Sequence, residues 1–292
     1  VVMRRNEQLE KSGIKFVLNT NVGEDITFDE IREKHDFVIL ATGVYKAREL
    51  DIPNGDLNGK VAALDYLTAS NRLSFGDRVE EFETGTFNAS GKKVVVIGGG
   101  DTAMDCVRTA VRQGATSVKC LYRRDRANMP GSQREVQNAE EEGVIFEWLT
   151  SPKGLSNQLR NTELLNLEAQ EGDLKGIIVQ KMRLGDPDAT GRRTPEEIKG
   201  SQYLEEADLV IEALGFEPED LPTLWDQPDL PVSRWGTIKV EYETGKTNLE
   251  KVYAVGDIVR GASLVVWAIK DGRDTANAIL SEIEATKVIA AE

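Results

Sequence analysis

Short apolar runs, rich in β-branched residues, recur along the chain and alternate with helical patterns. Residues 94–97 (VVVI) and 118–122 (VKCLY) are two such runs, and each suits a strand that is buried on both faces. Between them, Ala103, Val107 and Ala110 fall at helical spacing. Strands that alternate with helices in this way predict an α/β fold with a parallel sheet.

The same patterns assign elements to most of the remaining chain. We expect further helices over 1–12, 61–73, 132–142 and 264–285, and further strands over 14–18, 37–41, 144–148, 208–214, 236–241 and 251–257. Turn-rich or polar connections are expected over 53–59, 74–91 and 217–236.

The pattern changes between residues 160 and 206. LLNLEA (164–169) and GIIVQKMRL (176–184), with the loop DPDATGRRTPEE (186–197), predict antiparallel strands in place of another β-α-β unit.

Two related domains are expected. ILATG at 39–43 and IEALG at 211–215 both end buried strands, as two similar sheets would. The order of elements predicts one domain over 60–216, inserted between 1–59 and 217–292, which share the second sheet. The expected fold class is α/β, with one Rossmann-like domain inserted into another of the same type.

The glycines after residue 97 carry the strongest chemical signal. Gly98, Gly99 and Gly100 with Ala103 form G-x-G-x-x-A between a strand and a helix. Gly98 permits the tight turn, Gly100 lets a pyrophosphate approach the backbone, and Ala103 lets the helix pack on the strand. The positive end of the helix dipole faces the phosphates. The motif predicts a dinucleotide site.

The end of the next strand indicates which dinucleotide is bound. An NAD site usually has an acid there for the ribose 2′-hydroxyl. Here Asp125 is outnumbered by Arg123, Arg124 and Arg126, whose guanidinium groups suit a 2′-phosphate. A solvated basic loop is the alternative interpretation, but the position relative to the glycines favours NADP(H) over NAD(H).

A second segment, residues 252–273, suits a flavin. A predicted strand delivers Gly256 and Asp257 to its carboxyl end, where the carboxylate can accept hydrogen bonds from a ribityl chain. The amides of Val265 and Val266 at the next helix start can bind an electron-rich flavin edge. The alternative is an ordinary strand–turn–helix with an Asp in the turn.

Composition narrows the functional class. The net charge of −14 argues against nucleic acid or an anionic membrane as a partner, and no apolar run approaches the ~20 residues of a membrane helix. Cys106 and Cys120 lack metal-ligand spacing, so we expect no metal site and two buried thiols in a reducing cytoplasm. The single His35 lies in a charged stretch. Side-chain catalysis is therefore not expected, and the chemistry belongs to the cofactors.

The order ATG, GGGDTA, YRR and AVGD, at 41–43, 98–103, 122–124 and 254–257, resembles the two-dinucleotide flavoprotein reductase superfamily. Within it, LYRRDRANMPGSQREVQNAEEEG (121–143) and AVGDIVRGASLVVWAIKDGR (254–273) are similar to the small subunits of bacterial NADPH-dependent glutamate synthases. The resemblance extends over essentially the whole chain.

The resemblance implies a role for particular residues. The implied NADPH contacts are Gly98, Gly99, Gly100, Asp101, Thr102, Ala103, Arg123, Arg124, Glu135 near the nicotinamide end, and Gly215. The implied FAD contacts are Thr42, Gly43, Gly256, Asp257, Val265 and Val266.

The resemblance also implies partners. The family carries an N-terminal domain with 4Fe–4S clusters and a first glycine-rich turn for FAD. We expect both to precede Val1, so that this chain is a carboxyl-terminal part that is inactive by itself. The whole protein would pass electrons from NADPH through FAD and the clusters to a large subunit that makes glutamate from glutamine and 2-oxoglutarate. Alternatives are a dihydropyrimidine dehydrogenase-like or ferredoxin:NADP reductase-like subunit, or a non-catalytic nucleotide-binding or docking module.

Overall fold

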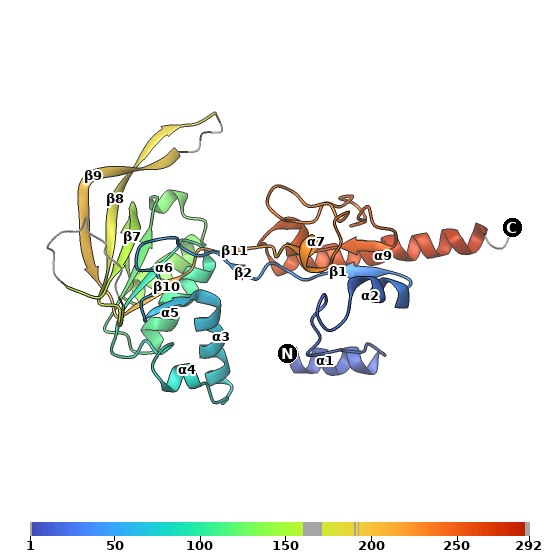
Figure 1. Ribbon diagram of the computed structural model, residues 1–292, viewed down its shortest axis with the longest axis horizontal. Helices are drawn as coiled ribbons and strands as arrows, with labels where there is room; N and C mark the ends of the chain where they lie inside the picture. Colours follow the sequence, from blue (N-terminus) through green and yellow to red (C-terminus); the bar gives the residue numbers. More distant parts are fainter. Residues whose placement is uncertain (1, 160–170, 190, 192, 290–292) are drawn as a thin grey trace. The chain divides into compact units, whose positions relative to one another are not determined.

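The computed structural model describes residues 2–159, 171–189, 191 and 193–289, and it divides into two compact units. Unit 1 comprises Val1–Lys46 and Glu217–Glu292, and unit 2 comprises Ala47–Phe216 (Figure 1). Where the chain passes from one unit to the other, the short strands β2 (Lys46–Ala47) and β11 (Phe216–Glu217) pair with each other. The expected α/β class is confirmed.

Unit 2 is built on a five-stranded parallel sheet. Its strands, in spatial order, are β3 (Lys60–Ala62), β10 (Leu209–Glu212), β4 (Lys93–Ile97), β5 (Ser117–Tyr122) and β6 (Ile145–Trp148). Side chains of a strand alternate between its two faces. On β4, Val94 and Val96 point to one core while Val95 and Ile97 point to another. The run VVVI is therefore continuous because both faces of the sheet are covered.

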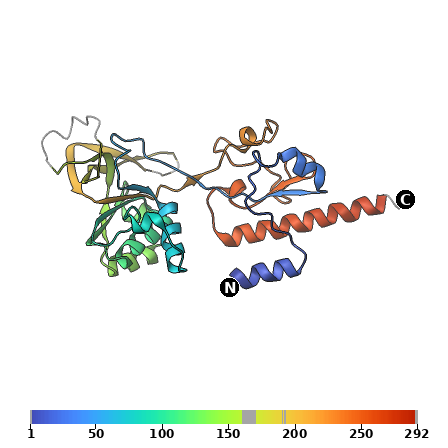
Figure 2. The ribbon, with the colours of Figure 1, turned by 60° about the horizontal axis from the view of Figure 1, so that its bottom comes forward.

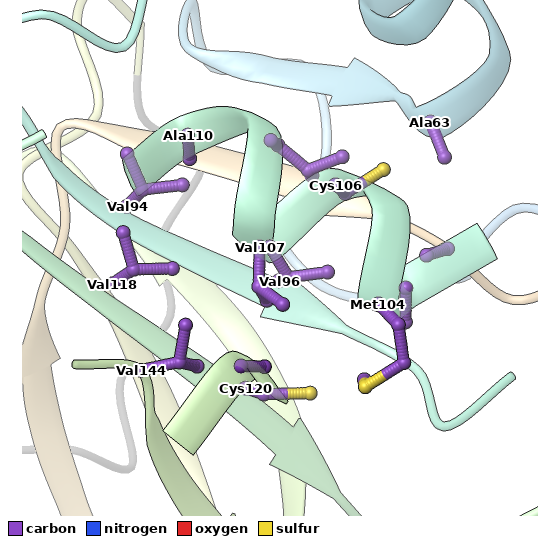
Figure 3. Packing of buried hydrophobic residues seen from close by; sticks show 14 of the residues in the cluster. Ala63, Val94, Val96, Met104, Cys106, Val107, Ala110, Val118, Cys120 and Val144 are labelled. Atoms are coloured by element: carbon purple, nitrogen blue, oxygen red, sulfur yellow. The ribbon is translucent and has the colours of Figure 1, made fainter. Parts of the chain in front are cut away.

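Helices cover one face of this sheet. They are α3 (Ala63–Ser74), α5 (Asp101–Arg112) and α6 (Gln133–Glu141), with the short α4 (Glu80–Glu83) and the 3₁₀ turn η1 (Arg126–Asn128) in the connections. Figure 3 shows Cys106, Val107 and Ala110 of α5 packed on Val94 and Val96 of β4. Ala103 and Cys106 are fully buried, and their small side chains let the helix pack closely on the sheet.

An antiparallel sheet covers the other face. It consists of β7 (Thr150–Ser156), β8 (Gly176–Pro187) and β9 (Arg193–Glu206), and Figures 1 and 2 show it opposite the helices of unit 2. The predicted antiparallel region is thus confirmed for β8 and β9, while LLNLEA (164–169) lies outside the described residues. Leu155 and Ile177 pack on Val95 and Ile97 of the parallel sheet.

Unit 1 contains a parallel pair of strands, β1 (Val38–Leu40) and β12 (Val252–Ala254). Its helices are α1 (Val2–Lys11), α2 (Phe28–Lys34), α7 (Leu221–Leu224), α8 (Asp257–Arg260) and α9 (Val265–Ile289). The core lies around Leu40 and Ile258, where the rings of Phe28 and Trp225 stack with their centroids 5.0 Å apart. Tyr253 of β12 donates a 2.6 Å hydrogen bond to Glu282 of α9, which attaches the long helix to the sheet.

Two predicted strands of unit 1 are wrong. Residues 14–18 are extended without a ladder, and Val17 and Leu18 are about three-quarters exposed (76% and 74%). Residues 236–241 form only an isolated bridge, Val232 to Ile238. Their backbone N–H groups donate to the preceding segment 231–233, to Ile258 of helix α8 (Asp257–Arg260) and to Lys246 instead of to one neighbouring strand, so the apolar alternation gives burial without a strand.

The boundary between the units lies earlier than the sequence indicates. The chain enters unit 2 after Lys46, whereas we expected the boundary after residue 59. The reason is that Leu50, Ile52 and Leu57 pack into the core between the two sheets of unit 2.

Within the described residues, no helix has both the length and the apolar composition needed to cross a bilayer.

Candidate functional site

A cleft of about 670 Å³ opens where β4, β5 and β10 end in unit 2. Ligands of open parallel sheets bind at this carboxyl edge. The lining residues come from five segments, 48–50, 97–100, 121–124, 150–152 and 213–215, together with Thr102, Asn128 and Pro130. Most of the predicted NADPH residues are therefore gathered around one cavity.

The surroundings of the three glycines of the motif differ, and so does the effect that a side chain would have at each position. Gly98 has a φ of +148°, and a Cβ there would lie 2.2 Å from the Ala213 carbonyl oxygen. A Cβ on Gly99 would lie 2.4 Å from the ring of Tyr122. Gly100 has an ordinary φ of −92°, and its Cβ would meet nothing within 4 Å. A side chain at Gly98 would clash with backbone and one at Gly99 with the Tyr122 ring, whereas Gly100 leaves open space at the start of α5.

The N-terminus of α5 faces this open space. Gly100 is its N-cap and, being a glycine, has no side chain to cap the first turn. The first N–H groups of a helix have no partner within the helix, and the dipole favours an anion there. The Asp101 carboxylate accepts a hydrogen bond of 3.0 Å from the Ser132 backbone, so it joins the start of α6 to α5. Thr102 lines the cleft, and Ala103 is buried in the core.

The arginines after β5 divide into two groups. Arg123 and Arg124 line the cleft, and neither has an ion-pair partner among the described residues. The Nε atom of Arg124 is buried without a hydrogen-bond partner in that same part of the chain. Arg126 instead binds Glu140 at 2.8 Å. Two guanidinium groups are thus available to an anion.

Asp125, the acid that follows β5, already accepts hydrogen bonds within its own loop. Asp125 accepts hydrogen bonds of 3.0 Å from the backbone N–H of Asn128 and 2.6 Å from its side-chain amide, which caps the η1 turn. Asp125 is not among the residues that line the cleft. The geometry therefore favours a 2′-phosphate over a free 2′-hydroxyl.

Gly215 and Glu135 lie in different surroundings. Gly215 lines the cleft after β10 with a φ of +84°, and its carbonyl oxygen accepts a 3.1 Å hydrogen bond from the Arg48 N–H. Glu135 lies on α6, binds Arg108 and is not among the lining residues.

Sequence reasoning did not identify Arg48, Glu49 or residues 150–152 as part of the cleft. They belong to no motif, and only the fold brings them to the carboxyl edge of the sheet.

In unit 1, the predicted FAD residues follow paired strands. Thr42 and Gly43 come after β1, and Gly256 and Asp257 come after β12, whose Ala254 is the register partner of Leu40. Both pairs therefore lie at the same edge of this small sheet.

The glycines of these pairs have left-handed backbones. Gly43 and Gly256 each have a φ of +72°, which a side chain would strain. Val265 and Val266 begin α9 with 71% and 59% of their surface exposed. The residues fit a ligand that contacts backbone and helix terminus, as a flavin does.

The thiols lie in the core. Cys106 and Cys120 are fully buried, and burial raises the pKa of the Cys120 thiol to about 12. Within the described part of the chain, no three His, Cys, Asp or Glu side chains form a group that could hold a metal.

Comparison with known proteins agrees with the geometry. Residues 7–272 match the pyridine nucleotide-disulphide oxidoreductase family. A relative from Cereibacter sphaeroides, named putative glutamate synthase (NADPH) small chain, is 65% identical over 100% of this chain and 67% of its own length. The glutamate synthase (NADPH) small chain of Azospirillum brasilense is 55% identical over 100% of this chain and 59% of its own length. This chain therefore spans about two thirds or less of these relatives.

The fold also matches a solved structure. Mycobacterium tuberculosis FprA in complex with NADPH aligns over 99% of this chain and 74% of its own, with a TM-score of 0.73 at 21% identity. That identity supports a shared fold alone. The sequence matches confirm the resemblance that the motifs indicated. The chain belongs to the pyridine nucleotide-disulphide oxidoreductase family and is a homologue of glutamate synthase NADPH small chains.

Proposed function

We propose that unit 2 binds NADP(H) in the cleft after β4 and that unit 1 contributes to an FAD site, as parts of an NADPH-dependent flavoprotein oxidoreductase. One observation carries this proposal: Arg123 and Arg124, which have no ion-pair partner among the described residues, line the same cleft as the start of α5, whose N-cap is a glycine. A phosphorylated dinucleotide has anionic groups for both.

The residues of the chain bind and orient, since the cofactors supply the chemistry, which is hydride transfer from nicotinamide to flavin. The α5 N-terminus would bind the pyrophosphate, and Arg123 and Arg124 the 2′-phosphate. In unit 1, Gly256, Asp257 and the start of α9 would hold the ribityl chain and the flavin ring. Binding both cofactors in fixed geometry is what the reaction requires of the protein.

A more specific function for the whole protein can be proposed from the relatives of this chain. We propose that the whole protein is the electron-input subunit of a glutamate synthase. Electrons would leave the flavin through 4Fe–4S clusters and reach a large subunit that forms glutamate from glutamine and 2-oxoglutarate. The high identity to two small chains of such enzymes supports this assignment. Glutamate formation with the large subunit present would distinguish it from other NADPH:acceptor reductases.

Coenzyme titration tests the nucleotide site. By calorimetry, the chain should bind NADP⁺ more tightly than NAD⁺. Replacing Arg123 and Arg124 together by Ala should weaken NADP⁺ by about 2–4 kcal/mol, because charge-assisted hydrogen bonds contribute about 1.5–3 kcal/mol each and solvent reduces that. The affinity for NAD⁺ should stay nearly unchanged.

The matched control is Arg126→Ala, which removes an arginine of the same loop that binds Glu140 outside the cleft. This variant should retain the wild-type preference for NADP⁺. Equal losses of NADP⁺ and NAD⁺ in the double variant would contradict the 2′-phosphate assignment.

A further inference from the structure

We infer that Arg48 is a binding residue for the phosphate on the nicotinamide side of the dinucleotide. The inference rests on the proposed NADP(H) site and extends it to a segment outside the glycine motif and the arginine loop. Arg48 lies just after the chain enters unit 2, and its side chain is exposed and lines the cleft.

The position of Arg48 is fixed by the strand on the far side of the glycine turn. In the sheet, β4 lies between β10 and β5. Arg123 and Arg124 follow β5, whereas the Arg48 N–H donates to the carbonyl oxygen of Gly215, just beyond β10. The cleft therefore has cationic groups on both sides of the turn that ends β4.

The backbone around Arg48 is held in place independently of any ligand. The N–H of Leu50 donates a 3.2 Å hydrogen bond to the buried Glu212 carboxylate, which also lies 3.4 Å from the ammonium of Lys60. These contacts fix the segment on the end of β10. Preorganised donors bind a ligand with less loss of conformational entropy.

The side chain of Arg48 is available to an anion. It has no ion-pair partner among the residues that the structure describes, unlike Arg108 and Arg126, which bind carboxylates. Glu49 also lines the cleft, so this side of the cleft is not uniformly basic. A single guanidinium beside an acid suits one phosphate better than a polyanion.

The shape of the ligand indicates which phosphate this is. If the 2′-phosphate binds Arg123 and Arg124 beyond β5, the adenosine half lies on that side of the turn. The nicotinamide half must then extend over β10, and the anionic group nearest to it is the second phosphate of the pyrophosphate. Arg48 lies on that side.

A fragment of the coenzyme can test the role of Arg48 separately from the NADP(H) site as a whole. The ligand 2′,5′-ADP carries the 2′-phosphate and the adenosine-side phosphate but lacks the nicotinamide-side phosphate. Calorimetric titrations of the full chain with NADP⁺, NAD⁺ and 2′,5′-ADP should be compared for wild type, Arg48→Ala and the control Arg193→Ala. Arg193 begins β9 and is exposed outside the cleft.

For Arg48→Ala, we expect about a tenfold loss of affinity for both NADP⁺ and NAD⁺, as one charge-assisted contact at an exposed site gives. Affinity for 2′,5′-ADP should equal that of wild type, and Arg193→Ala should change none of the three. Unchanged NADP⁺ binding by Arg48→Ala, or an equal loss of 2′,5′-ADP, would overturn the inference alone. A wild-type chain that binds neither NADP⁺ nor 2′,5′-ADP would overturn the proposed function itself.

Discussion

Gly98 and Gly100 lie two positions apart in one turn, but only the first is at a position where the structure itself requires glycine. At Gly98 the backbone has a φ of +148° and the Ala213 carbonyl lies where a Cβ would be. At Gly100 the backbone conformation is ordinary and the space beside it is open. The backbone itself needs the first glycine, whereas the second leaves room beside the start of α5.

This difference predicts opposite outcomes for two alanine variants. Gly98→Ala should lower the free energy of unfolding by about 3 kcal/mol or more, because strain and a backbone clash combine. Gly100→Ala should leave that free energy within about 1 kcal/mol of wild type and still weaken NADP⁺, because the methyl group occupies space that the pyrophosphate needs.

Urea unfolding and calorimetry measure the two effects separately. A stable Gly98→Ala protein, or a Gly100→Ala protein with full NADP⁺ affinity, would contradict the roles assigned to these glycines.

Between elements, a charged cluster joins α5 to α6 and its C-cap residue. Arg108 binds Glu135 and Glu142, and Arg112 lies 3.2 Å from Glu142. Hydrogen bonding from Arg108, followed by the charge of Arg112, lowers the pKa of Glu142. The cluster therefore ties the C-terminal half of α5 to α6 and its C-cap Glu142.

The lowered pKa predicts a pH dependence of stability. A carboxyl whose pKa is lower in the folded state stabilises the protein above its unfolded pKa of about 4.3, and this contribution is lost as pH falls through the folded pKa. Glu142→Gln should therefore cost about 1 kcal/mol at pH 7 and much less at pH 3.

Denaturant unfolding at both pH values tests this expectation. The control is Glu141→Gln on the same helix, whose side chain binds only Gln137 among the described contacts. If Glu142→Gln lost as much stability at pH 3 as at pH 7, the ion cluster would not be the cause.

Elements that carry a strong local pattern could be predicted from the sequence. The VVVI run, the helix after the glycines and the strand that ends at Tyr122 are where the pattern indicates, because burial on both faces leaves an unbroken apolar run. Residues 14–18 have a similar composition but no ladder, since a strand also depends on its neighbours. The short α2, α4 and α7 helices were missed because four to seven residues, one or two turns, are too few to show a period.

The candidate site likewise contains residues that a local motif reveals and one that only tertiary packing brings there. Gly98, Gly100, Arg123 and Arg124 could be found from the sequence because one β-α-β unit carries them all. Arg48 could not, because only the packing of its segment on β10 brings it to the cleft.

At the scale of the whole molecule, the chain crosses twice between its units, and each unit presents its candidate ligand residues at the carboxyl ends of parallel strands. This repeated plan suits a reductase that binds two nucleotides, one in each unit. In unit 2, a cleft, a helix N-terminus and two arginines that have no ion-pair partner among the described residues coincide, so this is where we propose that NADP(H) binds.

A crystal structure of the chain with bound NADP⁺ is the most direct test of this binding site in unit 2. We expect the pyrophosphate at the start of α5, within hydrogen-bond distance of the Thr102 backbone or its neighbours. We also expect the 2′-phosphate on Arg123 and Arg124, and the nicotinamide half beside Gly215. NADP⁺ bound elsewhere, or bound in this cleft with its 2′-phosphate away from both arginines, would contradict this proposal.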